Sequence, residues 1–381
     1  MNTKDVYCLG LPEGCIAYGK KADEFHVVKW MDVWRKGLRN LNFIVVLAGS
    51  KTAEVQGISA AGSTAYSRRF TALADAEFLI YGPFKKPEWN LPKLQAGFSP
   101  ALITYIGSKF LDLKPLIISV GLFEESTFPS LYLESPSEGP AFCLSKGKAM
   151  EFARVKKLFS KAFLMGKSSL KPTLITECVP GGTTTAQAVM TALGLPVGDL
   201  MGSSLRDPPL ALKRKLINKG LKEASLGKNP CPKKVIAAVG DPFQPVALGL
   251  LLGAREVDQP VILGGGSQMI AVLALALTTI DPSQRPRFLE GISIATTFWL
   301  AQEGKSSKQS KSTFMRLITL LESHFQVDIL AISSGLRFEN STKKVLRDYE
   351  IGYVKEGVGA GSVACLAQLN GATCNYLVNA C

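Results

Sequence analysis

The chain has 381 residues, of which 46% are hydrophobic and 20% are charged, and its mean hydropathy is +0.16. This composition excludes an intrinsically disordered chain and supplies enough apolar residues for a large core. The net charge of +13 favours anionic ligands. The basic residues are scattered, however, and the short clusters Lys213–Lys215 and Lys233–Lys234 have no aromatic residues between them. We interpret both clusters as solvated surface and expect no nucleic-acid partner.

Membrane and metal partners are not expected either. The apolar run Met269–Ile280 is much shorter than the ~20 residues that span a bilayer, so we predict a core helix there. No apolar run follows a basic start, so no signal peptide is predicted. The eight cysteines are dispersed and form no C-x-x-C pair. This pattern predicts reduced thiols in a cytoplasmic protein and no metal site.

Short apolar runs recur along the chain, with helical patterns between them. Near-continuous apolar runs are typical of strands that are covered on both faces. The pattern therefore predicts the α/β class, with a mostly parallel, Rossmann-like sheet flanked by helices. The predicted strands are Phe43–Ala48, Phe78–Tyr81, Leu116–Val120, Leu174–Glu177, Val235–Val239, Val261–Leu263, Ile292–Ala295 and Ile329–Ile332. Asp75 and Glu77 precede the second strand; a solvated strand entrance is the ordinary interpretation and a substrate contact is the alternative.

The stretch 173–194 combines a buried strand, a glycine turn and a helix that begins with three threonines. The first turn of a helix has N–H groups without partners, and its dipole favours negative charge. Glycine lets a ligand approach the backbone closely. We therefore predict a phosphate site with an acid beside it. Its candidate residues are Glu177, Gly181, Gly182, Thr183, Thr184 and Thr185.

Two further junctions of the same kind, 235–245 and 261–268, follow along the chain. Ligands bind outside the carboxyl ends of parallel strands, so we expect these loops to line the same crevice. Asp241 is predicted to end a strand and to meet a ribose hydroxyl; an N-cap role ahead of Pro242 is equally compatible. Gly264, Gly265 and Gly266 either admit a ligand to the backbone or form only a tight turn.

The tail supplies a fourth glycine-rich element at 352–365. Within it, Glu356 stands among glycines, of which Gly357 and Gly359 are candidates for nucleotide binding. A carboxyl group in a desolvated site has a raised pKa and can act as a base near neutral pH. A solvent-exposed glutamate at the start of a helix is the alternative interpretation.

Two of these elements resemble motifs of a known family. The segments Glu177–Ala186 and Lys355–Gly361 are similar to two motifs of the nicotinate-nucleotide:dimethylbenzimidazole phosphoribosyltransferases. More closely, the chain resembles a divergent archaeal and cyanobacterial branch of that family. Three further segments, Gly240–Pro245, Leu263–Gln268 and Ser334–Phe338, also resemble that branch. The resemblance runs from about residue 42 to about residue 370.

The resemblance implies both a fold and a reaction. It implies a large nucleotide-binding domain at 42–335 and a smaller domain built from 1–41 and 336–381, in a homodimer. Family members move 5-phosphoribose from nicotinate mononucleotide to a benzimidazole, which gives α-ribazole phosphate for the lower ligand of cobalamin. The family's general base matches Glu356, and its acid before the glycine–threonine segment matches Glu177. No cofactor is implied.

This chemistry agrees with the residues. The acceptor loses an N–H proton as its other nitrogen attacks the ribosyl carbon, and one buried carboxylate suffices for that. Nicotinate leaves as a neutral pyridine, so neither an acid nor a metal is required. The chain departs from the family pattern at Gly182, where asparagine is usual, and at Lys355, where glycine is usual. The acceptor therefore stays open between dimethylbenzimidazole, adenine and another aromatic base. A nucleotide-binding regulator without catalysis is the alternative function.

Overall fold

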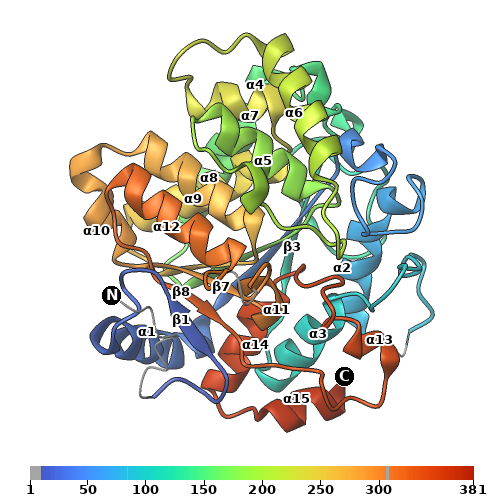
Figure 1. Ribbon diagram of the computed structural model, residues 1–381, viewed down its shortest axis with the longest axis vertical. Coiled ribbons are helices and arrows are strands. Elements are labelled where there is room, and N and C mark those ends of the chain that lie inside the picture. The colour runs from blue at the N-terminus through green and yellow to red at the C-terminus, as the bar shows by residue number, and fades with distance from the viewer. Residues whose placement is uncertain (1–9, 84, 306–308) are drawn as a thin grey trace.

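The computed structural model describes residues 10–83, 85–305 and 309–381 (Figure 1). The first nine residues of the predicted segment 1–41 lie outside the described residues. Within the described ranges, eight strands form one sheet in the order β1-β8-β7-β6-β5-β2-β3-β4. All neighbouring strands are parallel except β1 and β8. The strands are β1 Ile16–Tyr18, β2 Asn42–Ala48, β3 Leu116–Val120, β4 Leu131–Tyr132, β5 Thr173–Cys178, β6 Val261–Gly264, β7 Ile292–Thr296 and β8 Ala331–Ser333.

Helices cover both faces of the sheet, as Figure 1 shows. This arrangement confirms the predicted α/β class. The upper layer contains α4 Phe152–Ser168, α5 Gly182–Ala192, α6 Leu210–Ala224, α7 Pro232–Val239, α8 Phe243–Glu256, α9 Ser267–Thr279, α10 Arg285–Leu289 and α12 Thr313–Phe325. The lower layer contains α1 Glu24–Gly37, α2 Thr71–Tyr81, α3 Ala101–Phe110 and α14 Ala360–Leu369. The short helices α11 Phe298–Ala301, α13 Lys344–Arg347 and α15 Cys374–Ala380 join α3 and α14 in a third apolar cluster.

The strand order reverses between β2 and β5. After β2 the chain adds β3 and β4 on one side, and then returns to place β5 on the other side of β2. In open parallel sheets the loops diverge at such a reversal and leave a crevice at the carboxyl ends of the strands. The topology therefore positions a site where β5 ends, at Cys178.

Two predicted strands are wrong. Phe78–Tyr81 is the last turn of α2, and Val235–Val239 lies within α7. Both helices are buried, and a short apolar run has no period that distinguishes a buried helix from a buried strand. Asp75 and Glu77 therefore lie on a buried helix and not at a solvated strand entrance. The other six predicted strands overlap observed ones.

The predicted core helix at 269–280 is confirmed as α9, in which Met269–Leu277 are all fully buried. No helix in the described part of the chain has the length and apolar character to cross a membrane. Segments from the first and last parts of the described chain both contact the sheet, because β1 pairs with β8 and α14 packs beneath β6, β7 and β8. The division into a large domain at 42–335 and a smaller one from the two chain ends stays a prediction.

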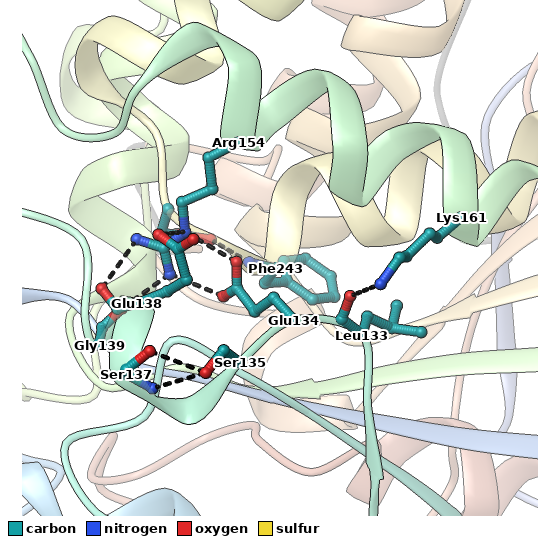
Figure 2. Close-up of polar contacts among 10 residues, drawn as sticks. Leu133, Glu134, Ser135, Ser137, Glu138, Gly139, Arg154, Lys161 and Phe243 are labelled. Atoms are coloured by element: carbon teal, nitrogen blue, oxygen red, sulfur yellow. Dashed lines mark hydrogen bonds and ion pairs between the residues drawn. The ribbon is translucent and has the colours of Figure 1, made fainter.

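A buried ion pair fastens the loop after β4 to α4 (Figure 2). Arg154 donates to both oxygens of Glu134, at 2.9 Å from Nε and 2.7 Å from Nη2. Its Nη2 also donates to the Gly139 carbonyl at 2.7 Å. The side chains of Arg154 and Glu134 are 10% and 4% exposed, so each charge depends mainly on its partner and not on water. The pair thus fixes the segment that follows the edge strand β4.

Replacing Arg154 by methionine is expected to destabilise the fold by about 3 kcal/mol, because it strands the Glu134 carboxylate in a buried position. Urea denaturation measures the free energy of unfolding. The double variant Arg154→Met with Glu134→Leu is expected to recover a large part of the loss. A loss below about 1 kcal/mol in the single variant would show that water replaces the guanidinium.

Candidate active site

A cavity opens at the carboxyl edge of the sheet, next to the reversal between β2 and β5. One wall comes from the end of β5 and the turn into α5, at 177–183, and from the turn into α9, at 266–268. The rest of the cavity wall comes from the segments 59–61, 92–100 and 202–204 and from the loop 354–358. The site therefore gathers residues from the whole chain length around one strand end.

Two helices begin at the cavity wall. Gly181 precedes α5 with φ +78°, in the left-handed region, and a Cβ there would lie 3.1 Å from the Ala53 Cα. Gly181, Gly182 and Thr183 all line the cavity. Gly266 lines it just before α9 begins at Ser267. Helix N-termini favour anions, so this part of the cavity, which we call the phosphate lobe, suits a phosphate.

Several predicted residues do not line the cavity. Thr185 donates its hydroxyl to the Asp241 carboxylate, and Thr184 is fully buried. Asp241 lies in the turn between α7 and α8, not after a strand, and it accepts from Gln268 Nε2 at 2.7 Å and Phe243 N at 3.1 Å. Asp241 therefore contacts Gln268 of the cavity wall and binds an N–H group at the start of α8. The latter contact corresponds to the N-cap role that the sequence offered as an alternative.

The predicted glycines of the segments 261–268 and 352–365 also fall into two groups, those that line the cavity and those that do not. Gly266 and Gly357 line the cavity, whereas Gly264, Gly265 and Gly359 do not. A Cβ on Gly264 would lie 2.3 Å from Ser362 Oγ, and one on Gly359 would lie 2.3 Å from Thr176 Cγ2. These two glycines allow α14 to pack closely on β5 and β6. They shape the site without facing it.

Lys213 is a site residue that the sequence interpretation missed. It is fully buried on α6, where its Nζ donates to Thr183 Oγ1 at 3.1 Å and to the Gly202 carbonyl at 2.9 Å. Both acceptors belong to residues of the cavity wall, so the ammonium lies directly behind the phosphate lobe. Burial lowers the pKa of Lys213 to about 8.

The interpretation of the basic cluster as solvated surface is therefore wrong for Lys213, although Arg214 and Lys215 are exposed. A signal was present in the sequence. Lys213 lies four and seven residues before Ile217 and Gly220, and these three are the buried residues of α6. A lysine on the buried face of an amphipathic helix points to a specific partner for its charge.

Glu356 is held by four donors. Its Oε2 accepts from Thr296 Oγ1 at 2.9 Å and from Thr297 N at 2.7 Å. Its Oε1 accepts from the backbone N–H groups of Gly357 at 3.1 Å and Gly361 at 3.2 Å. Gly361 lies in the first turn of α14, so the carboxylate occupies the positive end of a third helix. Burial raises the pKa of Glu356, and these hydrogen bonds oppose that rise.

The loop that carries Glu356 has an unusual backbone. Val354, Lys355 and Val358 have φ values of +65°, +65° and +53°, a region that residues with side chains rarely adopt. Lys355 is buried, and its Nζ forms an ion pair with Glu303 Oε1 at 2.7 Å and donates to the Leu205 carbonyl at 3.0 Å. These contacts hold the strained loop against the cavity.

Glu177 also lines the cavity but has a different environment. Burial, and next the nearby charge of Asp241, raise the pKa of Glu177 to about 8. At neutral pH its carboxyl group is therefore mostly protonated and is able to donate a hydrogen bond. The two glutamates thus meet in one cavity in different environments. Glu356 is surrounded by four donors and suits the role of an acceptor, whereas the protonated Glu177 suits the role of a donor.

Asp75, which the sequence left unassigned, is a third acid in the cavity wall. Its two carboxylate oxygens accept from Ser99 Oγ at 2.5 Å and from Cys178 Sγ at 3.2 Å. Burial raises the pKa of Asp75 to about 6. Within the described ranges, no group of three or more His, Cys, Asp or Glu side chains is placed to hold a metal ion.

The raised pKa of Glu177 makes stability depend on pH. Its ordinary pKa is 4.5, so the folded protein retains a proton that the unfolded chain releases, and stability falls as the pH rises from about 5 to about 8. We expect Glu177→Gln to remove this loss. The difference in melting temperature between the variant and the parent protein should increase by about 2 °C or more as the pH rises from about 5 to about 8, measured by calorimetry. The exposed Glu151, changed to Gln, is the control, and parallel curves for all three proteins would contradict the assignment.

Comparisons with known proteins show which family the chain resembles. The sequence profile described as Phosphoribosyltransferase matches residues 140–291, which include the first glutamate motif. It confirms the resemblance to phosphoribosyltransferases. The chain is 52% identical to a UPF0284 protein of Prochlorococcus marinus (strain MIT 9313), over 98% of this chain and 92% of the relative. It is 46% identical to one of Parasynechococcus marenigrum (strain WH8102), over 98% and 93%.

Two solved structures share the fold. One is CobT from Thermus thermophilus, with a TM-score of 0.59, 17% identity, and coverage of 92% of this chain and 91% of that chain. The other is a nicotinate-nucleotide-dimethylbenzimidazole phosphoribosyltransferase from the same organism, with a TM-score of 0.54, 17% identity and coverage of 91% and 90%. At this identity the likeness establishes the architecture alone.

Proposed function

The chain belongs to the UPF0284 protein family, and from that premise and the geometry of its cavity we propose that it is a phosphoribosyltransferase. It moves 5-phosphoribose from nicotinate mononucleotide to a benzimidazole-type base and forms α-ribazole phosphate for the lower ligand of cobalamin. The observation that carries the proposal is one cavity with a phosphate lobe and a buried carboxylate at a helix N-terminus.

The phosphate of the nucleotide binds in the phosphate lobe. The N-termini of α5 and α9 supply positive dipole ends, and Thr183 supplies a hydroxyl. Lys213 adds a full charge directly behind Thr183. A dianion bound there also raises the fraction of Lys213 that is protonated, because opposite charges favour each other's ionised forms.

Glu356 acts as the general base on the acceptor. It takes the N–H proton while the other ring nitrogen forms a bond to the anomeric carbon of the ribose. The bond from that carbon to the nicotinate nitrogen breaks, and its electron pair makes the leaving pyridine neutral. The Thr296 hydroxyl can rotate away from Oε2 and free a lone pair for the proton. Protonated Glu177 donates a hydrogen bond to an oxygen of the nucleotide.

The proposal includes a homodimer, as the resemblance implies, and a cytoplasmic location, as the dispersed cysteines predict. One feature that supports an interface is the outer face of α1, where Phe25 is 71% exposed and Val28 is 39% exposed. Isolated apolar residues are common on surfaces, but a phenylalanine this exposed on a helix fits a contact with a second chain. Light scattering on the purified chain tests the dimer.

Glu356→Gln is expected to lower kcat by about a hundredfold or more, because the amide retains the shape of the side chain but cannot take the proton. The assay follows α-ribazole phosphate formed from nicotinate mononucleotide and dimethylbenzimidazole. Binding of the nucleotide, measured by calorimetry, should change little. Turnover near that of the parent protein would remove Glu356 as the base, and binding without turnover of any base in the parent protein would favour a non-catalytic regulator.

Lys213→Met is expected to weaken binding of nicotinate mononucleotide by about tenfold or more, through loss of a buried charge next to the phosphate. Binding of nicotinate riboside, which has no phosphate, should change far less. Lys215→Met, on the exposed face of the same helix, is the matched control. Equal effects on the nucleotide and the riboside would place the phosphate elsewhere.

A further inference from the structure

Asp75 has no part in the transfer as described, although its carboxylate lines the same cavity and is 4% exposed. It lies in the second turn of α2, and its two side-chain partners, Ser99 and Cys178, are neutral donors. Among the ion pairs of the described residues, none includes Asp75. An acid buried without a cation is costly, so its presence calls for a ligand that compensates it.

The position of Asp75 places it beside the acceptor and not beside the phosphate. One partner of Asp75, Cys178, directly follows Glu177 on β5. The other partner, Ser99, directly precedes Pro100. Pro100 packs against Gly357, the residue after Glu356, so closely that a Cβ on Gly357 would lie 2.8 Å from the proline ring. Asp75 is therefore tied to the two segments that carry the glutamates. The phosphate lobe is formed by different segments, at 181–183 and 266–268.

The cavity that Asp75 lines also contains Glu177, whose pKa is raised by burial and also by nearby charges that include Asp75, and several apolar residues. The wall of the same cavity contains Ala60, Ala61, Pro92, Leu94 and Pro100, which suit the faces of an aromatic ring. A carboxylate has about four acceptor positions, and the two neutral donors use two of them. An aromatic base that carries an N–H or O–H group at this edge would satisfy a third. A methyl group at the same edge would press against the carboxylate and leave it without water.

Resting on the function proposed above, we propose that Asp75 selects the acceptor. The acceptor class is an imidazole-fused bicyclic base with an amino or hydroxyl group on its six-membered ring, in preference to dimethylbenzimidazole. Glu356 contacts the imidazole edge of this base, where the proton is lost. Asp75 accepts a hydrogen bond from the substituent on the opposite edge.

The size of the preference for a hydroxyl or amino group over a methyl group depends on how each group interacts with the Asp75 carboxylate. A site that hydrogen-bonds a substrate group rejects an analogue without it far more strongly than an apolar pocket rejects an added hydroxyl. Because Ser99 and Cys178 already stabilise Asp75, we expect a moderate preference, of about tenfold or more in kcat/KM.

The test compares two acceptors of nearly equal size, 5-hydroxybenzimidazole and 5-methylbenzimidazole, with nicotinate mononucleotide as the donor. The parent protein is expected to prefer the hydroxyl compound. Asp75→Asn should lower the ratio of the two kcat/KM values by about fivefold or more, and Asp75→Val should reverse the preference. The KM for the nucleotide should stay within about twofold, because the phosphate lobe is unchanged. Glu77→Gln, the same kind of change on the same helix but outside the cavity, should keep the ratio.

The outcomes separate this inference from the proposed function. Turnover without a preference in the parent protein, or a ratio that Asp75→Asn does not change, overturns the role of Asp75 and leaves the transferase intact. Equal losses with both acceptors would mean that Asp75 supports the positive charge of the ribosyl group, which also overturns it. If no base turns over, the proposed function fails, and calorimetry with the two benzimidazoles still decides: equal dissociation constants in the parent protein refute the selection.

Discussion

The parallel direction of the strands is the constraint on which the site depends. Strands β2 to β8 all end at the same edge of the sheet, so the helices that follow them begin there. The N-termini of α5 and α9 therefore meet at one cavity, and α14 returns from the end of the chain to bring a third. Two of these positive ends remain available to a substrate anion, whereas the third is occupied by the Glu356 carboxylate.

Burial and the local hydrogen bonds give the acids of this one cavity different surroundings and different influences on their pKa values. Glu356 accepts four hydrogen bonds, which oppose the effect of burial on its pKa, whereas Glu177 lies near the charge of Asp241 and holds its proton to a pKa of about 8. Asp75, with two neutral donors, has a pKa of about 6. Burial thus raises the pKa of all three carboxyl groups, and the different neighbours of each group modify that rise.

The loop around Glu356 shows how the fold maintains a strained segment. Positive φ angles at Val354 and Lys355 cost free energy, and the buried ion pair between Lys355 and Glu303 offsets part of it. Lys355 is also one of the two residues, with Gly182, at which the chain departs from the pattern of the family it resembles. The departure at Lys355 places a second buried ammonium close to Lys213 and the phosphate lobe. Lys355 therefore holds the loop that carries Glu356, and its charge adds to the effect of burial in lowering the pKa of Lys213.

The sequence by itself determined the α/β class, six of the strands, the helix after Gly182 and the segments that carry the two glutamates. These depend on local patterns: apolar runs, glycine turns and helix starts. Only the tertiary structure decided that Val235–Val239 is a helix, because an apolar run reports burial and not backbone conformation. It also decided that Lys213 is buried and that Asp75 faces Cys178, 103 residues away. The helical spacing of Lys213, Ile217 and Gly220 indicates a buried face, but the partners of each charge come from residues distant in the chain, and no local pattern names them.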